Sequence, residues 1–383
     1  MEKLLPEICT IQYGFPFDSS KFSDTDGVPL IRIRDVVRGY SQTFTTEEYK
    51  KEYLVYEGDL LIGMDGEFNI AKWGNIPALL NQRVCRLIPT SEVDKDYLFY
   101  FMPNALKRIE QKTPFVTVKH LSAKELNKVR VPLPPMEEQR KIAAQLDKVS
   151  DLIAKRQAQL DKLDLLVKAR FVEMFGDPVL NPMAWPEKQL ECMADIVSGI
   201  TKGRKTKEVD LKEVPYMAVS NVKDGYIDWT TVKTILATKS EIEQYRLLPD
   251  DVLMTEGGDP DKLGRGAIIQ NPLENCIHQN HVFRVRLDED VLLPIYFSEF
   301  LQHQKAKQYF LRCAKQTTGI ASINMRQLKG LPTLVPPIEL QKQFATFKVH
   351  VDRAKVINKL SLRNLRILKK SLLNDICMEG RLI

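Results

Sequence analysis

The chain has 383 residues, of which 44% are hydrophobic and 28% are charged, and its formal net charge is +6. This length is enough for two domains with cores of their own, and the composition is ordinary for a soluble protein. Because it has no apolar run of about 18 residues and no basic-then-apolar leader, we expect no membrane-spanning helix, no signal peptide and no membrane partner. The small excess of positive charge favours a polyanionic partner only weakly.

The cysteines and histidines give no indication of a metal site. Six cysteines lie singly along the chain without a CxxC pair, which argues against a zinc ribbon. This pattern instead indicates buried thiols in a reducing compartment, so we expect a cytoplasmic protein. The five histidines are dispersed, and no HExxH motif or paired His/carboxylate spacing is present.

Residues 1–135 form the first predicted domain, which we name the first head. Its short apolar runs at 30–33, 60–62 and 84–88 are separated by Gly, Asp and Asn, a pattern typical of strands joined by turns. Residues 96–101 then predict a helix that continues toward Arg108. We therefore expect a mixed α+β globule.

Residues 136–176 predict a first long helix, or rod. Pro134 and Pro135 cannot continue a helix from upstream, so they mark its start, and the Gly-Asp-Pro sequence at 176–178 ends it. Its apolar residues recur at alternating steps of three and four, the spacing of a coiled-coil seam, with Arg156 and Arg170 as polar exceptions. The apolar seam residues are Ile142, Leu146, Val149, Ile153, Leu160, Leu163, Val167 and Met174.

Residues 177–337, the second head, repeat the first head with longer loops, and residues 294–301 predict the equivalent helix. Apolar framework positions recur while the polar residues between them change. This pattern favours two similar readers with different targets, and the alternative is a duplication kept for structure alone. The matching segments are 5–14 with 190–199, 28–36 with 214–222, 58–61 with 250–253, and 83–87 with 281–285.

Residues 338–383 predict the second rod, whose seam is interrupted by Asn358 and Ser361. A polar seam residue commonly fixes register and partner choice. The apolar seam positions are Phe344, Phe347, Val351, Ala354, Leu365, Leu368 and Leu372. Each rod is about 60 Å long at about 1.5 Å per residue. A lone rod would expose its apolar stripe, so we expect the two to pair antiparallel, with the heads related by a pseudo-twofold axis.

The segments PLPPMEEQRKI at 132–142 and VPPIELQKQF at 335–344 resemble the PLPP-x-x-EQ segment of type I restriction-modification specificity subunits. The spacing of Trp185, Leu190, Ile196 and Gly199 resembles the start of that family's target recognition domains. The resemblance extends over the whole chain in the order head–helix–head–helix. One departure is Leu340, which stands where the family pattern has an acidic residue.

This resemblance implies two α+β target recognition domains joined by two long helices that pair as an antiparallel coiled coil. It further implies a non-catalytic subunit that binds double-stranded DNA, with each head contacting one half of a bipartite, asymmetric sequence. The helices would set the spacer and dock two adenine methyltransferase subunits, and restriction subunits would join that core.

The chain lacks the motifs that an enzyme of such a complex would need. It has no [ND]PPY tetrad or FxGxG loop for methyl transfer, no GxxxxGK[ST] loop for ATP and no GxSxG nucleophile motif. We therefore expect no catalytic residues, no cofactor and no resident metal.

Candidate DNA contacts in the second head are loop cations, because phosphate contacts need Lys, Arg and small polar groups on accessible loops. The densest group lies at 201–207 and a second at 261–266, although both loops are equally consistent with a role in solubility alone. The residues are Lys202, Arg204, Lys205, Lys207, Lys262 and Arg265.

Candidates in the first head begin with Arg32 and Arg34, which we expect to project from one face of a strand, with Asp35 as an ion-pair partner. Their counterparts in the second head are Ala218 and Ser220. Arg, Asn and Gln favour base reading, although the same residues also serve as turn caps. The remaining candidates are Lys72, Lys119, the cluster Asn81, Gln82 and Arg83, its match Gln279, Asn280 and His281, and Asn221.

A second reading of the chain is a coiled-coil scaffold whose heads bind protein. The basic and amide-rich loops that differ between the heads favour DNA, and salt-dependent binding to duplex would separate the two readings.

Overall fold

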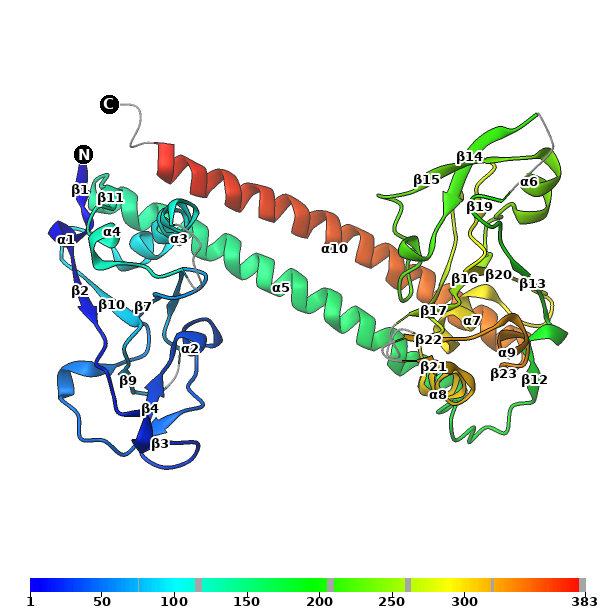
Figure 1. Ribbon diagram of the computed structural model, residues 1–383, viewed down its shortest axis with the longest axis horizontal. Coiled ribbons are helices and arrows are strands. Elements are labelled where there is room, and N and C mark those ends of the chain that lie inside the picture. The colour runs from blue at the N-terminus through cyan, green and yellow to red at the C-terminus, as the bar shows by residue number, and fades with distance from the viewer. Residues whose placement is uncertain (75, 114–118, 205–209, 259–262, 318–319, 379–383) are drawn as a thin grey trace. The chain divides into compact units, whose positions relative to one another are not determined.

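The computed structural model describes residues 1–383 apart from 75, 114–118, 205–209, 259–262, 318–319 and 379–383 (Figure 1). The chain divides into two compact units. The first unit comprises Met1–Ala158 and Lys359–Ile383, and the second comprises Gln159–Asn358. Each unit therefore contains one head together with parts of both rods.

The described strands of the first head form three sheets, and the separated apolar runs had predicted strands joined by turns. An antiparallel sheet has the order β2-β10-β7-β8, a mixed sheet has the order β3-β5-β4-β9-β6, and β1 pairs with β11. The strands are β1 (Glu2–Leu4), β2 (Cys9–Tyr13), β3 (Phe22–Ser23), β4 (Val28–Ile31), β5 (Phe44–Thr45), β6 (Leu54–Val55), β7 (Leu60–Gly63), β8 (Asn69–Lys72), β9 (Ala78–Leu80), β10 (Val84–Pro89) and β11 (Arg130–Pro132).

The helix predicted from residue 96 is α3 (Lys95–Lys112), and it covers the antiparallel sheet through a buried core that includes Tyr97 and Leu98. The Asp94 carboxylate accepts hydrogen bonds from the backbone N–H groups of Asp96 and Tyr97, which fixes the start of α3. The other helices of this head are α1 (Leu5–Ile8), η1 (Ser19–Lys21), α2 (Ile33–Arg38), η2 (Lys51–Tyr53) and α4 (Ala123–Leu126).

The second head repeats this set of sheets. Its antiparallel sheet has the order β13-β20-β16-β18, a mixed sheet has the order β15-β14-β19, β12 pairs with β23, and β17-β22-β21 form an additional sheet. The strands are β12 (Glu187–Gln189), β13 (Ala194–Ser198), β14 (Lys212–Met217), β15 (Lys233–Ala237), β16 (Val252–Thr255), β17 (Gly257–Gly258), β18 (Gly266–Ile268), β19 (Ile277–His278), β20 (Val282–Leu287), β21 (Lys315–Thr317), β22 (Ile320–Ser322) and β23 (Pro332–Leu334).

The helix predicted at 294–301 is α7 (Pro294–Phe300), which buries Tyr296, Phe297 and Phe300 in the second core. Its N-terminal Pro294 suits the first turn, where the missing N–H would have no partner. The remaining helices are η3 (Leu190–Cys192), η4 (Val219–Asn221), α6 (Lys239–Tyr245), α8 (Gln304–Cys313) and α9 (Met325–Lys329).

The two rods are α5 (Met136–Phe175) and α10 (Ile338–Met378), and both begin at the predicted residues. Helix α5 ends directly before the glycine that was predicted to end it, whereas the predicted end of the second rod lies outside the described residues. All predicted seam positions of α5 are at least half-buried. The prediction for α10 is wrong at Leu368, which is 46% exposed, because the buried stripe instead runs through Leu362 and Ile376. Among the helices of the described residues, none has the length and apolarity needed to cross a membrane.

Each unit buries the rod segments that belong to it. In the first unit, Ala143 and Leu146 of α5 share the core with Ile376 of α10. In the second unit, Phe171 and Phe175 of α5 share the core with Phe344 of α10. The apolar residues that predict a coiled-coil seam therefore pack both against the other rod and against a head.

The PLPP-x-x-EQ resemblance has a structural explanation in the Gln of each copy. The Gln139 Oε1 accepts from the Asp94 N–H at 2.8 Å, and its Nε2 donates to the carbonyls of Glu92 and Pro134. The second copy repeats all three bonds: Gln341 Oε1 accepts from the Leu293 N–H at 2.8 Å, and Nε2 donates to the carbonyls of Val291 and Pro336. Each rod is thus fastened to its head by a buried amide.

Gly14 and Gly199 mark a second repeated contact. A Cβ atom on Gly14 would lie 2.0 Å from the Asn81 carbonyl oxygen, and one on Gly199 would lie 2.0 Å from the His278 carbonyl oxygen. Only glycine permits the backbone to pass so closely over the end of β9 and of β19. The predicted pairing of 5–14 with 190–199 therefore corresponds to the same chain crossing in both heads.

Candidate nucleic-acid interface

The candidate interface of the first head is the edge at which two parallel strands end. Strands β4 and β9 run parallel, with Ile31 opposite Leu80, so the residues that follow them emerge at the same place. These residues are Arg32 and Arg34 after β4, and Gln82 and Arg83 after β9, and all four are exposed. We name this set the strand-end edge of the first head.

The second head builds the same edge with other residues. Strands β14 and β19 are parallel, with Met217 opposite His278. Ala218 and Ser220 follow β14, and Gln279, Asn280 and His281 follow β19. Whereas the first edge carries three arginines, the second carries amides and a histidine. The predicted match of 81–83 with 279–281 is confirmed, since Phe15 bridges to Asn81 and Ile200 bridges to Gln279.

The local structure around Arg32 and Arg34 differs from the prediction. They do not alternate along a strand, because β4 ends at Ile31 and α2 begins at Ile33. The cause is Asp35, whose Oδ2 accepts from the Arg32 backbone N–H at 2.9 Å and so starts the helix. Asp35 is buried and forms its ion pair with Arg38 at 3.1 Å, a different partner from the one predicted.

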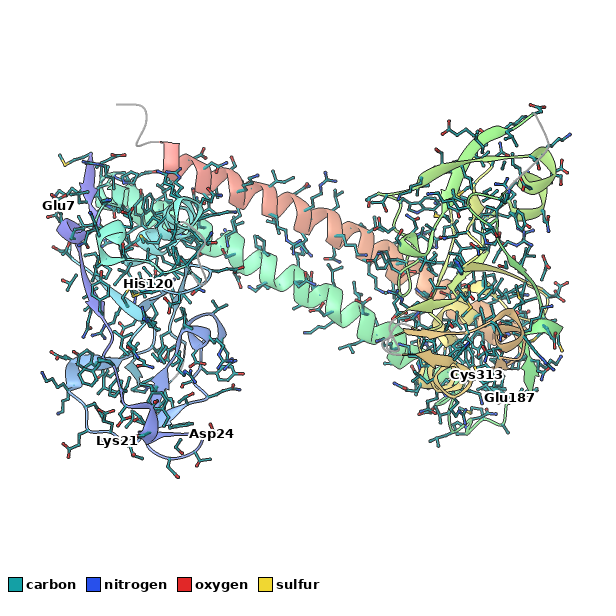
Figure 2. The ribbon with its side chains drawn as sticks, viewed as in Figure 1. Glu7, Lys21, Asp24, His120, Glu187 and Cys313 are labelled. Atoms are coloured by element: carbon teal, nitrogen blue, oxygen red, sulfur yellow. The ribbon has the colours of Figure 1, made fainter. Side chains whose placement is uncertain are left out.

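Arg83 lies where three segments of the first head meet. Its carbonyl accepts from the Met64 N–H at 2.9 Å, and the Met64 carbonyl accepts from the Leu121 N–H at 2.7 Å. The guanidinium Nε lies 3.6 Å from Asp65 Oδ2, and Nη1 lies 3.3 Å from His120 Nδ1. His120, labelled in Figure 2, places its Nδ1 2.6 Å from Asp65 Oδ1.

His281 occupies the position of Arg83 in the second head. Its carbonyl accepts from the Glu256 N–H at 3.0 Å, and the Glu256 carbonyl accepts from the Ile323 N–H at 2.8 Å. Its Nδ1 lies 2.5 Å from Glu256 Oε2, and the Asn280 Nδ2 lies 3.3 Å from its Nε2. In both heads, a side chain that can donate hydrogen bonds is therefore held by a neighbouring carboxylate at the edge.

Two amide candidates are structural rather than accessible. Asn221 is 1% exposed, and its Oδ1 accepts from the Ala218 N–H at 3.0 Å while its Nδ2 donates to the Asp228 carbonyl at 2.9 Å. Asn81 is 7% exposed, and its Oδ1 accepts from the Gln82 N–H at 2.8 Å. Both side chains are buried and bonded within a local turn, which disfavours them as DNA contacts.

Two lysine candidates of the first head contact groups within the head itself. The Lys72 Nζ lies 2.9 Å from Asp96 Oδ1 and 4.9 Å from the centre of the Phe99 ring, so it joins β8 to α3. The Lys119 Nζ donates to the Glu110 carbonyl at 2.9 Å and thereby holds its segment against the end of α3. Internal partners thus account for both ammonium groups.

The basic loop at 201–207 offers fewer free positive charges for DNA contact than its sequence predicts. Lys202 is exposed, but Arg204 is half-buried and donates through Nε and Nη2 to the carboxylate of Glu241 on α6. This hydrogen bonding from Arg204 holds the pKa of Glu241 below its usual range. Lys205 and Lys207 lie outside the described residues.

The loop at 261–266 is described only in part. Lys262 lies outside the described residues. Arg265 is half-buried, and its carbonyl accepts from the Thr255 N–H at 3.0 Å. Gln279 is also half-buried, with Oε1 3.4 Å from the Val219 N–H. The loop around Arg265 and the edge residue Gln279 therefore both lie beside the ends of the central strands of the second head.

Asp65 and Glu256 were not among the residues predicted for the two edges. A signal was present, because each is an acidic residue followed by glycine within two residues of the end of a buried strand, in Asp65-Gly66 and Glu256-Gly257. Asp65 and Glu256 are not at equivalent positions of the repeat. The residue equivalent to Glu256 is Met64, which makes the same backbone hydrogen bonds. In the described part of the chain, no cluster of three His, Cys, Asp or Glu residues is arranged to hold a metal ion.

Comparison with known proteins gives one consistent relationship. Residues 1–163 match the model of the type I restriction modification DNA specificity domain. The chain is 29% identical over 369 residues to the specificity subunit of the type I restriction enzyme EcoBI from Escherichia coli, an alignment that covers 88% of this chain and 76% of that one.

Two solved structures share the fold. The type I restriction-modification S subunit from M. genitalium matches with a TM-score of 0.62 and 14% identity, over 98% of this chain and 95% of that one. A second structure, from work on complex assembly and conformational transition of the type I R-M system, matches with a TM-score of 0.58 and 17% identity, over 98% and 97%. At these identities the likeness concerns the fold.

Proposed function

Because the chain belongs to the specificity subunits of type I restriction-modification systems, we propose that it reads a bipartite, asymmetric DNA sequence, with one half-site for each head. Specificity subunits are non-catalytic, so the chain supplies recognition while partner subunits supply the chemistry. The DNA-specificity description of the matched domain supports this role for the first head. The internal repeat extends it to the second head.

The observation that carries the proposal is the strand-end edge, where the two heads share the same backbone arrangement but carry different side chains. Both heads end two parallel strands at this edge, and both hold a donor side chain there with a carboxylate. The polar groups differ, with exposed Arg32, Arg34 and Arg83 in one head and half-buried Asn280 and exposed His281 in the other. A common scaffold with different base-reading groups is suited to two different half-sites.

The rods support a fixed spacer between those half-sites. The start of α5 packs with the end of α10 in the first unit, and the end of α5 packs with the start of α10 in the second. These contacts favour antiparallel pairing of the rods. A 40-residue helix is about 60 Å long, somewhat under two turns of B-DNA at about 34–36 Å per turn.

The outer faces of the rods support docking of partner subunits. In the second unit, Leu165 and Leu166 of α5 are exposed, as are Val356 and Ile357 of α10. Apolar side chains in such number on helices that already have a buried seam mark an interaction surface. We assign this surface to two methyltransferase subunits, with restriction subunits joining that core, in line with the complex assembly studied for the second structural relative.

The competing function is a coiled-coil scaffold whose heads bind protein and do not read DNA. The exposed rod residues are equally consistent with a scaffold. The strand-end edges therefore have to distinguish the two functions. An edge with three exposed arginines and one carboxylate, Asp65, has an excess of positive charge, which favours phosphate and base contacts over a generic protein surface.

The test is the salt dependence of duplex binding by the complex with its methyltransferase subunits. Affinity for randomised duplex should fall linearly on a log–log plot as salt rises, and changing Arg32→Gln and Arg34→Gln together should flatten the slope by up to about two. The exposed pair Lys124→Gln and Lys128→Gln on and beside α4 is the matched control. A slope that the edge variant leaves unchanged would favour the scaffold.

A further inference from the structure

We propose that Arg83 reads a guanine in the half-site of the first head, with Asp65 and His120 as positioning residues. This inference rests on the proposed function and deepens it, because it assigns a base to one side chain. The first head alone carries an arginine at this position, since its counterpart in the second head is His281. The effect of Arg83 should therefore be confined to one half of the target.

The backbone at Arg83 is the first observation. Its φ angle is +72°, in the left-handed region that favours glycine or asparagine. Residues other than glycine are strained in this region and cluster at functional sites. A turn that needed only its conformation would be better served by glycine, so the side chain of Arg83 is the reason to have arginine there.

The second observation is how the guanidinium is held. Asp65 approaches Nε at 3.6 Å and His120 approaches Nη1 at 3.3 Å, while His120 is itself fixed 2.6 Å from Asp65. The Arg83 side chain remains 54% exposed. Asp65 thereby orients the Nε side of the planar group, and the exposure of the side chain leaves part of the guanidinium fork accessible to a base.

The chemistry of that fork selects the base. Guanine presents two acceptors, O6 and N7, on its major-groove edge, and paired arginine N–H groups match them in a bidentate contact. Adenine offers one acceptor and one donor on the same edge, which suits an asparagine or glutamine amide. Asn280 supplies such an amide in the second head, beside a histidine rather than an arginine.

A purely structural ion pair is the competing explanation. Exposed ion pairs contribute little to stability, so breaking the contact with Asp65 would then change neither the sequence preference nor the fold appreciably. Base reading predicts a different result, because substitutions of Arg83 and of Asp65 must then change the preference at the same base pair.

The experiment compares methylation maps of the complex, co-expressed with its methyltransferase subunits, for the unchanged chain and for Arg83→Gln, Arg83→Lys and Asp65→Asn. The unchanged chain should give a split motif with a G·C pair at one position that Arg83→Gln relaxes by about tenfold, while the other half stays the same. Arg83→Lys should relax it less, and Asp65→Asn should relax that same position. Arg130→Gln, an exposed arginine on β11, is the matched control and should change nothing.

Three results would overturn the inference: a motif that Arg83→Gln leaves intact, a change at an A·T pair, or equal changes in both halves. The absence of any split motif for the unchanged chain would instead remove the proposed function, and the inference with it. Thermal melting of each complex shows whether a lost signal reflects unfolding. If Arg83→Gln does not fold, Arg83→Lys and Asp65→Asn decide the question.

Discussion

At the scale of single residues, the most informative side chains are Gln139 and Gln341. Each is buried, and each satisfies one backbone N–H and two backbone carbonyls where a rod meets its head. The aromatic hydroxyls repeat the arrangement, since Tyr97 donates to the Pro132 carbonyl and Tyr296 to the Leu334 carbonyl. The repeated motif in the sequence is therefore a fastening between helix and head.

Replacing Gln139 with alanine should lower the free energy of unfolding of the complex by about 1–3 kcal/mol, because the Asp94 N–H would be left buried without an acceptor. Gln145→Ala, at an exposed position of the same helix, is the control and should change it little. Urea unfolding of both variants measures the difference. Equal stability of the two variants would show that the amide does not fasten the rod.

His278 makes the stability depend on pH. It is fully buried, its Nδ1–H donates to the Val282 carbonyl at 2.7 Å, and burial lowers its pKa to about 4. The unfolded chain has a histidine pKa near 6.5, so between these values the unfolded state binds more protons and stability falls as pH falls. From pH 7 to pH 5 the loss should be about 2 kcal/mol.

Urea unfolding at pH 7 and pH 5 tests this expectation, with His278→Gln as the variant in which this contribution disappears. His350→Gln, at an exposed position, should retain the full pH dependence. If the variant at residue 278 keeps the same pH dependence as the unchanged chain, the buried imidazole is not its source.

At the scale of elements, the two rods and the helices α3 and α7 were predictable, and the strand ends were not. Proline before each rod and glycine after α5 set limits that local chemistry alone decides. The four-residue run at 30–33 was misassigned because the cap from Asp35 acts from beyond the run. Leu368 was misassigned because the heads, as well as the partner rod, decide which face of α10 is buried.

The rods should act as a ruler. Deleting one heptad from each, residues 152–158 of α5 and 361–367 of α10, keeps the seam on one face and shortens the pair by about 10 Å at about 1.5 Å per residue. The unspecified gap in the methylated motif should then shorten by about three base pairs while both half-sites persist. Altered half-sites with an unchanged gap would contradict the prediction that the length of the rods sets the gap.

At the scale of the whole molecule, the internal repeat predicted the architecture better than the site. Framework residues such as Gly14 and Gly199 recur because a close chain crossing permits nothing else. Site residues vary between the heads, so the repeat could not identify them, and charge alone selected Arg204, which pairs with Glu241. Asp65 and Glu256 were missed because the candidates were chosen for positive charge or amide groups, and these two residues are carboxylates.

The central claim is that two similar heads read two different half-sites. Mapping N6-methyladenine in DNA from cells that co-express this chain with its methyltransferase subunits tests it most directly. We expect a single motif with two short, different halves around an unspecified gap. A stable complex that methylates nothing, or that methylates one continuous sequence, would contradict it.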